Sequence, residues 1–571
     1  MKKSIFKLSK KYSILTSALL AFSFMFSACA PKKVEVSTDS LALIVPENAT
    51  FYAIFENYDE YMALFAKEKG YAEAMEALKS NKKINDVLLK IYAPILELNE
   101  ELTSIFIDKE NFIASYEELV LNSITDGILF STSKLDCAAE EFKLPLTILL
   151  RIQNEKILEK IKESFAKSES LVLETVGDKE IYKSKVKDSD FFVCIADGYL
   201  AFAFLKEDIL SVFDSLKNPP AKSILDNAKF QKISKDFNAN VFAAFMDFNA
   251  LENINVENEL GKNTLDNIES LGFFASYNTV YEFDMSFRAI LKDESLVYNV
   301  LSELALSKLD SVKRALANSE LVVSYAAPQL TKSLTELLMK LEGGEEILDS
   351  MKTDPVTSLF TDNLQQIDIS IVDIANIAKV MEGKTPKVLA NAYFKDANKV
   401  MTNENFIQTF ASMMFSAEKI DGLDCLVSMF GITIAKISDT QISVIYTKDL
   451  SNALKTASGN GDSLVSNEFA KKMLDKVSDK NSFITAYMDY LPFIAMQRDI
   501  TLKQLEFLEE NEKGKEIAEY MNILFELTEA AYKKCGVSSN VKCKDNMFSW
   551  NFFAVVDLDF EALAKKAKEI K

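Results

Sequence analysis

Histidine is absent from this chain of 571 residues. Its absence excludes Ser-His-Asp and Cys-His catalytic sets, histidine-ligated zinc, copper and iron sites, and an imidazole pH switch. Glycine and proline are scarce, at 15 and 10 residues, and the chain contains no low-complexity tract. With 48% hydrophobic residues, the composition is therefore typical of a folded body with a sizeable core.

Sequence motifs of common enzyme classes are also lacking. The chain has no GxSxG elbow, no Walker phosphate loop, no GxGxxG dinucleotide motif and no DxDxDG calcium loop. No pair of cysteines has the CxxC spacing of a zinc or redox site. We therefore expect no metal, no cofactor and no catalytic residues of a known set.

Positive charge is in deficit. The formal net charge is -20, and removing residues 1–28, which carry five lysines and no acid, changes it to -20 - 5 = -25. Such a surface repels phosphate backbones, and no basic stripe interrupts it, so nucleic acid is excluded as an expected partner. The charge favours solubility and weak adhesion to anionic membranes.

The first residues form an export signal. Five lysines (Lys2, Lys3, Lys7, Lys10, Lys11) precede an apolar stretch from Ile14 to Phe26, and small residues follow it. The segment Phe26-Ser27-Ala28-Cys29 resembles the lipobox of bacterial lipoproteins. The resemblance implies a signal peptide at residues 1–28, acylation of Cys29, for instance by palmitate, and a tether at residues 29–40. An uncleaved anchor, or ordinary cleavage after Ala28 or Ala30, is the alternative.

A lipidated cysteine predicts that the protein lies in the cell envelope, attached to a bacterial membrane. Ala30, rather than an aspartate, follows Cys29, which favours the outer membrane over the inner one. No later segment is long and apolar enough to span a bilayer. The membrane is therefore an expected partner through the anchor alone.

An internal repeat organises the rest of the chain. The position differences are 386 - 145 = 241 for two prolines, 439 - 197 = 242 for two turn aspartates, and 489 - 247 = 242 for aspartates ending similar strands. A nearly constant offset over about a hundred residues is the signature of a duplicated unit. The second copy also carries a longer helix-rich insert at residues 501–534.

The repeat predicts an α+β fold of two tandem related domains, 41–315 and 316–571. Each domain is expected to have an antiparallel sheet with helices packed on one side, because strand-like alternation at 281–291 and 548–558 accompanies amphipathic helical patterns at 157–165 and 209–216.

Cysteines other than Cys29 number five, and two of them flank a turn-like stretch. Cys535 and Cys543 lie on either side of Gly536-Val537-Ser538-Ser539-Asn540, in a compartment that favours oxidation, so a local disulfide is one expectation and two free thiols the other. Cys194 lies in an apolar run and is expected to be inert packing.

The duplicated aspartates Asp247 and Asp489 raise the question of catalysis. Two carboxylates at a suitable distance hydrolyse glycosides without histidine. Each aspartate also stands just before a candidate helix, where aspartate commonly caps backbone amides. The capping role is the preferred interpretation, and a glycan hydrolase is kept as an alternative function.

The segment Leu41-Ala-Leu-Ile-Val-Pro46-Glu-Asn-Ala49-Thr-Phe51-Tyr52 resembles the start of bacterial envelope lipoproteins described only as domains of unknown function. The resemblance implies an exported, lipid-anchored protein without an assigned activity. The leading hypothesis is a non-catalytic binding or structural role, with an envelope protein or a small apolar ligand bound in a Phe-lined groove between the halves. A carrier of apolar ligands is a further alternative.

Overall fold

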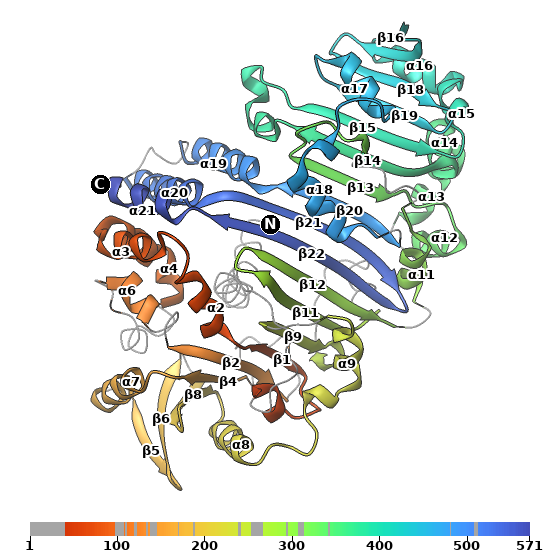
Figure 1. Cartoon of the computed structure of the whole chain (residues 1–571). Helices are drawn as coiled ribbons and strands as arrows, with labels where there is room; N and C mark the ends of the chain where they lie inside the picture. Colours follow the sequence, from red (N-terminus) through yellow and green to blue (C-terminus); the bar gives the residue numbers. More distant parts are fainter. Residues whose placement is uncertain are drawn as a thin grey trace.

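The computed structural model describes residues 40–96, 108, 111–118, 123–132, 135–136, 146–168, 171–186, 189–237, 241–252, 267–292, 295–306, 313–340, 343–479, 481–506 and 512–570. The signal peptide expected at 1–28, and the tether from Cys29 to residue 39, lie outside these ranges. In the described part, no helix combines the length and the apolar character that crossing a membrane requires. The fold is α+β and is built on one large antiparallel sheet (Figure 1).

The first half of the chain forms one half of this sheet. Its strands pair, from the outer edge inward, in the order β5 (Val172–Val176), β6 (Lys179–Val186), β7 (Ser189–Ala196), β8 (Tyr199–Ala203), β4 (Thr147–Ile152), β2 (Ile124–Ser131), β1 (Phe51–Phe55), β9 (Phe242–Asp247), β11 (Ile268–Thr279) and β12 (Glu282–Leu291). All of these pairings are antiparallel. Two short strands, β3 (Leu135–Asp136) and β10 (Leu251–Glu252), form a separate parallel pair, and the 3-10 turn η6 (Phe248–Ala250) precedes β10.

The second half continues the same sheet outward. From the centre to the far edge, the order is β22 (Met547–Leu558), β21 (Tyr532–Lys544), β20 (Ser482–Asp489), β13 (Leu321–Ala326), β14 (Leu364–Val372), β15 (Lys387–Phe394), β19 (Gln441–Tyr446), β18 (Ile432–Ser438), β17 (Leu423–Ser428) and β16 (Phe415–Ile420). β12 of the first half pairs with β22 of the second, so the sheet is continuous through both halves.

The strand order reads the same from both edges. β5 occupies at one edge the place that β16 occupies at the other, and the correspondence continues inward through β1 and β13 to β12 and β22. The helices expected at 157–165 and 209–216 are present in the first half, as α7 (Glu155–Lys167) and α8 (Lys206–Lys217). The offset of about 242 residues seen in the sequence is the spacing of the equivalent strands from β2 to β9. The first residues of β1 and β13 are 321 - 51 = 270 residues apart, and those of β12 and β22 are 547 - 282 = 265 apart.

One face of the sheet is covered by short helices at equivalent places in the two halves. In the first half these are η1 (Leu41–Ile44), α8, η5 (Ile224–Asp226) and α9 (Ala228–Ser234), and in the second half α17 (Leu450–Ala457), η9 (Leu464–Ser466) and α18 (Glu468–Val477). Asparagine caps both α9 and α18, because Asn227 Oδ1 accepts from Phe230 N at 3.0 Å and Asn467 Oδ1 from Ala470 N at 3.1 Å. We call this face the α9/α18 face.

The opposite face carries the remaining helices. They are α2 (Tyr58–Phe65), α3 (Tyr71–Ser80), α4 (Lys82–Leu96), α6 (Phe112–Tyr116), α7, α11 (Leu296–Glu303), α12 (Lys332–Met339), α13 (Gly344–Thr353), α14 (Pro355–Asn363), η8 (Ile374–Glu382), α15 (Ala397–Met401), α16 (Glu404–Ser412), α19 (Tyr490–Glu506), α20 (Glu512–Ala531) and α21 (Phe560–Glu569).

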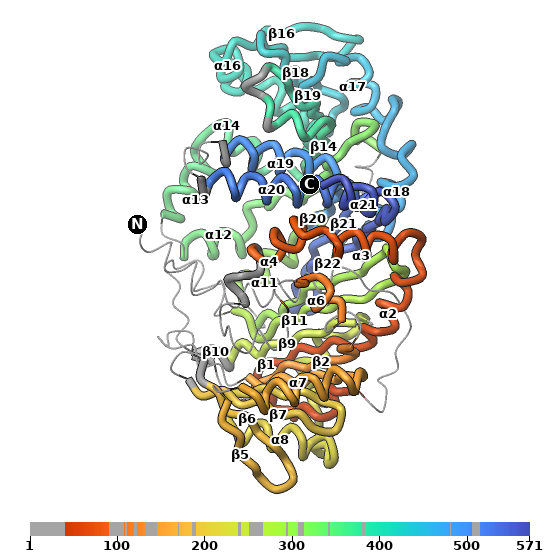
Figure 2. The backbone as a smooth tube through the Cα atoms, turned by 90° about the vertical axis from the view of Figure 1, so that its left-hand side faces the viewer, coloured from red at the N-terminus to blue at the C-terminus, as the bar shows by residue number. Residues whose placement is uncertain are grey.

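Figure 2 shows α11 to α14 on one side of the sheet and α18 on the other. The expectation of helices on one side only was wrong. Both surfaces of these strands carry apolar residues, so a single helical layer would leave one apolar surface uncovered.

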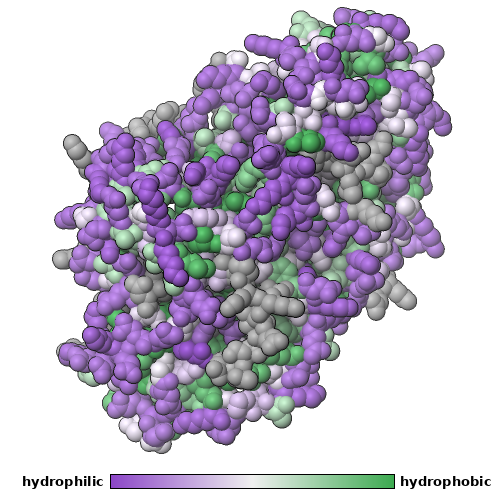
Figure 3. Space-filling model, viewed as in Figure 1, coloured by the Kyte–Doolittle hydropathy of each residue, from purple (hydrophilic) through white to green (hydrophobic). Residues whose placement is uncertain are grey.

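Hydrophilic residues dominate the molecular surface seen in Figure 3, in keeping with the net charge of -20. The insert predicted at 501–534 is helical over most of its described length, in the end of α19 and in α20, but its last residues already belong to β21. Helices α20 and α21 of the second half pack against α3 and Phe65 of the first. The halves therefore share an apolar core as well as a sheet.

Candidate functional site

The place where the two halves meet is centred on one cross-strand pair. Ser286 of β12 lies opposite Asn551 of β22, and the Ser286 hydroxyl donates to Asn551 Oδ1 at 2.7 Å. Each of the two strands follows a hairpin with two residues in its loop, 280–281 and 545–546. Counted from these hairpins, 286 and 551 are equivalent positions, so the pair lies on the approximate twofold axis that relates the halves.

Aromatic and apolar side chains gather around this axis on the face opposite α9 and α18. Met285 lies opposite Phe552, and Phe287 lies opposite Trp550. We call these four residues the junction cluster. The indole of Trp550 is 42% exposed, and its ring centroid lies 4.6 Å from that of Phe552. The other three members are half-buried.

Helices border the junction cluster on two sides. Beyond Met285 lies the core shared by α2, α3, α20 and α21, and beyond Trp550 lies the core formed by α11 with Ala289, Val541 and Cys543. Between them the cluster keeps part of its apolar surface accessible to solvent. Within the described residues, the structure does not show the Phe-lined groove expected between the halves. Strands β12 and β22 pair directly, and the junction cluster lies on the surface of a continuous sheet.

The α9/α18 face of the sheet carries an unusual row of polar side chains. Starting at the axis, directly opposed residues on successive strands are Ser286, Asn551, Asn540, Thr485, Ser324, Asp368, Asn391 and Ser443. All except the half-buried Asn551 are buried. We call this set the polar row.

Hydrogen bonds connect neighbouring members of the polar row and link it to the helices above. Asn551 Nδ2 donates to Asn540 Oδ1 at 2.9 Å, and Asn540 Nδ2 donates to the carbonyl oxygen of Val477, the last residue of α18. Further out, the Ser443 hydroxyl donates to Asn391 Oδ1 at 2.7 Å, and Gln441 Nε2 donates to the same oxygen at 3.1 Å. These bonds offset the desolvation of the side chains that make them, whereas Ser324 Oγ, Thr485 Oγ1 and Asp368 Oδ2 are buried without a hydrogen-bond partner among the described residues.

Asp368 is the one carboxylate in the polar row. Its side chain is 3% exposed, and Oδ1 accepts a hydrogen bond from Gln366 Nε2 at 2.7 Å. Burial raises the pKa of Asp368 to about 6, against the opposing effects of hydrogen bonds to its side chain and of the nearby Arg314 guanidinium. Arg314 itself bonds Gln441 and lies over the ring of Tyr393, 5.7 Å from its centroid.

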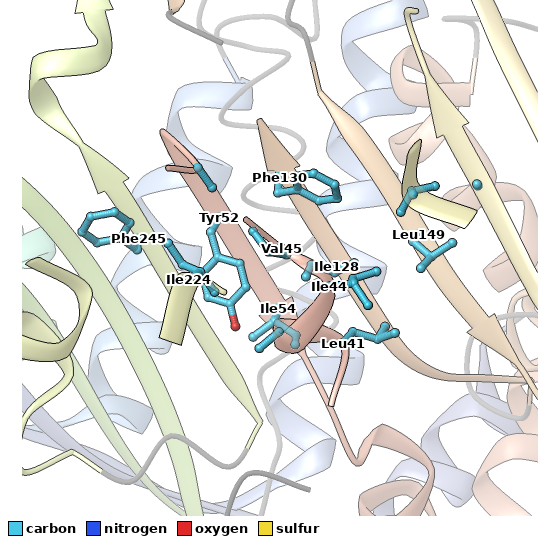
Figure 4. Packing of buried hydrophobic residues seen from close by; sticks show 14 of the residues in the cluster. Leu41, Ile44, Val45, Tyr52, Ile54, Ile128, Phe130, Leu149, Ile224 and Phe245 are labelled. Atoms are coloured by element: carbon cyan, nitrogen blue, oxygen red, sulfur yellow. The ribbon is translucent and has the colours of Figure 1, made fainter. Parts of the chain in front are cut away.

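The equivalent row in the first half is apolar. Outward from Ser286, directly opposed residues on successive strands of the first half are Phe274, Ala243, Ile54, Ile128, Leu149 and Ala201. They occupy, in the same order, the positions that Asn540, Thr485, Ser324, Asp368, Asn391 and Ser443 occupy in the second half. All six are buried in one hydrophobic cluster, of which Figure 4 labels Ile54, Ile128 and Leu149. The two halves share a framework but differ in the chemistry of their interiors.

Sequence reasoning missed the polar row. In β14 the alternating residues Gln366, Asp368 and Ser370 are buried, whereas Ile367, Ile369 and Ile371 are half-buried. Alternation alone predicts the isoleucine side as the buried one. The available signal was that the polar side lacks lysine and glutamate and consists of short side chains that can satisfy each other by hydrogen bonds.

The aspartates considered as a catalytic pair do not meet. Asp247 ends β9 and Asp489 ends β20, and five inter-strand spacings, about 24 Å, separate these strands in the sheet. Two carboxylates that hydrolyse one glycosidic bond lie within about 10 Å of each other. Asp247 instead accepts from Asn249 N at 3.0 Å and pairs with Lys229, and Asp489 accepts from Leu491 N at 3.2 Å. Both therefore cap the chain that follows, as the preferred interpretation expected.

Of the two expectations for Cys535 and Cys543, the local disulfide was wrong. Both residues lie in the single strand β21, eight positions apart, which corresponds to about 26 Å of extended chain. Both are free and buried, as are Cys194 and Cys425. Burial raises the pKa of Cys535 to about 12 and that of Cys543 to about 11, so these thiols are poor nucleophiles.

The acylation site expected at Cys29 lies outside the described residues. Within those residues, no group of three or more aspartate, glutamate or cysteine side chains is arranged to hold a metal ion.

Comparison with known proteins gives few matches. No family model matches the chain, and no curated protein matches it. Two solved structures, crystal forms III and IV of TP0453, align with TM-scores of 0.24 and 0.23 and sequence identities of 12% and 10%. Each alignment covers 48% of this chain and 92% of the TP0453 chain. Scores this low carry no argument about fold or function.

Proposed function

We propose that this chain is a lipid-anchored protein of the bacterial cell envelope with a non-catalytic binding role. The leader and Cys29 support the anchor, since they resemble a lipoprotein signal. The outer membrane is the favoured location because Ala30 follows the cysteine. The separation of Asp247 from Asp489 argues against the alternative of a glycan hydrolase.

We infer further that the halves 41–315 and 316–571 are two copies of one ancestral unit. The observation in favour is the strand order, which repeats from edge to centre and meets at the pair Ser286 and Asn551. Antiparallel pairing of equivalent strands about a twofold axis is how two identical subunits commonly join their sheets. In this interpretation, duplication and fusion turned such a pairing into a contact within one chain.

The junction cluster is the observation that carries the binding role. Met285, Phe287, Trp550 and Phe552 keep apolar surface accessible beside the twofold axis, and Trp550 is 42% exposed. Accessible aromatic groups at a junction between structural units are typical of ligand sites. The class of ligand that this surface fits is an apolar or amphipathic molecule, or the apolar segment of an envelope protein. The carrier hypothesis draws on the same surface.

Binding at the junction cluster is testable by fluorescence because Trp550 is the single tryptophan of the chain. We expect that titration with lauric acid, below its micellar concentration, shifts the emission of Trp550 to shorter wavelength as the acyl chain covers the indole. The variant Phe287→Ser, which removes the cross-strand neighbour of Trp550, should weaken this binding about tenfold, since burying one aromatic side chain contributes roughly 1.5 kcal/mol or more.

Leu205→Ser is the matched control for that titration. Leu205 is also an exposed large apolar residue, but it lies before α8, away from the junction, and its replacement should leave the titration unchanged. An emission spectrum that lauric acid does not move, or one that moves equally in Phe287→Ser, would contradict binding at this surface.

The anchor has its own test. Cells expressing the chain and grown with labelled palmitate should incorporate label into the wild-type protein and not into Cys29→Ser. The wild-type protein should fractionate with membranes. If the wild-type protein takes up no label, the lipid anchor is refuted whatever the result of the fluorescence titration.

A further inference from the structure

Four large apolar side chains are exposed together at one end of the sheet. The exposed fractions are 54% for Met413, 64% for Met414, 72% for Met429 and 67% for Phe430. The first two residues follow α16, and the last two lie in the loop 429–431 between β17 and β18. Phe415 and Ser428, which adjoin these segments, are paired across β16 and β17, so the two apolar segments lie side by side. We call these four residues the tip.

The backbone at the tip supports a role for one of these side chains. Met414 has φ of 63°, in the left-handed region that glycine and asparagine favour at the end of a helix. A non-glycine residue in this conformation costs about 1 kcal/mol. Here the sequence retains a long apolar side chain at a position that is both strained and exposed. Folding alone does not explain that choice, because glycine would stabilise the same turn.

The size of the tip limits what can cover it. Taking about 200 Å² for each side chain, the exposed fractions correspond to roughly 500 Å² of apolar surface. A stable protein interface needs about 800 Å² from each partner. The tip is formed by a helix end and a neighbouring loop, and hydrophobic residues reach the surface at this end of the molecule in Figure 3. The tip is therefore too small for a stable interface with a second copy of the chain. The apolar interior of a lipid bilayer can bury a small projecting group of apolar side chains without a matching surface.

We propose that the tip inserts into the surface of a lipid bilayer, as a contact separate from the anchor. The inference rests on the proposed function, because the lipid anchor keeps the protein close to a membrane. Residues 29–39 span at most about 40 Å when extended. The tip lies about 60 Å from β1 across twelve inter-strand spacings of the sheet. An inclined molecule can therefore reach one bilayer with both its tether and its tip.

The test uses the mature chain with Cys29→Ser, which retains every described residue and has no acyl group. Vesicles of zwitterionic phosphatidylcholine are the probe, because the negative net charge opposes binding to anionic lipid. We expect this protein to float with the vesicles in a density gradient. The double variant Met429→Ser with Phe430→Ser should reduce the bound fraction at least tenfold.

Two further variants make the test specific. Met414→Gly removes one inserted side chain while relieving the strained backbone, so it should weaken flotation and raise thermal stability together. Val172→Ser with Leu173→Ser removes exposed apolar residues from β5, at the opposite edge of the sheet, and should float like the parent.

Three results would overturn the proposal. The unacylated protein does not float, the β5 variant loses flotation as much as the tip variants, or the tip variants convert a dimer to a monomer in light scattering without changing flotation. None of these results bears on acylation of Cys29, which palmitate labelling decides independently.

Discussion

Asp368→Asn is expected to stabilise the folded protein at pH 7.5 by about 3 kcal/mol. In the folded state burial raises the pKa of Asp368 to about 6, whereas an unfolded aspartate titrates near 3.8. The difference of about two pKa units corresponds to about 3 kcal/mol between the two protonation states. Asparagine is uncharged at every pH and its Oδ1 can still accept the hydrogen bond from Gln366 Nε2.

The sign of this effect fixes its pH window. Because the folded state binds the Asp368 proton more tightly than the unfolded state, the wild-type protein loses stability as pH rises from about 4 through 6. Above about pH 7 the loss is complete and constant, because the folded carboxylate is then almost fully ionised. The advantage of Asp368→Asn should therefore be full at pH 7.5, about half as large at pH 5, and absent below about pH 3.

Thermal unfolding followed by circular dichroism at pH 5 and pH 7.5 measures this window. Asp197→Asn is the matched control, since Asp197 lies in the exposed hairpin turn between β7 and β8 and its φ of 53° suits asparagine equally well. If Asp368→Asn were less stable than wild type at pH 7.5, the prediction would be wrong. Hydrogen bonds and charge interactions would then stabilise the ionised carboxylate by more than its desolvation costs.

Ile128→Asp, at the position equivalent to Asp368, is expected to destabilise the protein by about 4 kcal/mol or more at pH 7.5. Ile128 is 2% exposed, and its cross-strand neighbours are Ile54 and Leu149. The substitution removes a buried aliphatic side chain and places a carboxylate where these neighbours offer no hydrogen-bond donor. The same residue type is accommodated in the second half because Gln366 and Arg314 accompany it.

Ile128→Val provides the control, because it shortens the side chain without adding a polar group. Its expected loss is about 1 kcal/mol. Urea unfolding of both variants at pH 7.5 gives the comparison. If Ile128→Asp were as mild as Ile128→Val, the interior of the first half would have to be accessible to water, and the contrast between the two interiors would disappear.

Equivalent buried positions of the two halves carry apolar side chains in the first half and polar side chains in the second. Ile54, Ile128 and Leu149 correspond to Ser324, Asp368 and Asn391. An apolar core tolerates little chemical change, whereas a hydrogen-bonded interior depends on each partner being present. Substitutions in the polar row should therefore couple to each other more strongly than substitutions in the equivalent apolar row.

The linear pattern was sufficient to predict the α+β class and the amphipathic helices α7 and α8. The turn at Asp197-Gly198 was equally readable, and both residues have the positive φ that this dipeptide favours in a hairpin. Each of these features is encoded within a few neighbouring residues. Local backbone preference and hydrophobic periodicity therefore specify it without reference to the rest of the chain.

Features that depend on partners distant in sequence were not predictable. The stretch Gly536-Val537-Ser538-Ser539-Asn540 has the composition of a turn, yet it is central strand, because β20 and β22 pair with it on both sides and Asn540 bonds the end of α18. The polar side of β14 is buried and its isoleucines are half-buried for a similar reason. Which side of a strand faces the interior is set by the helices and strands that assemble around it, and those lie tens to hundreds of residues away in the chain.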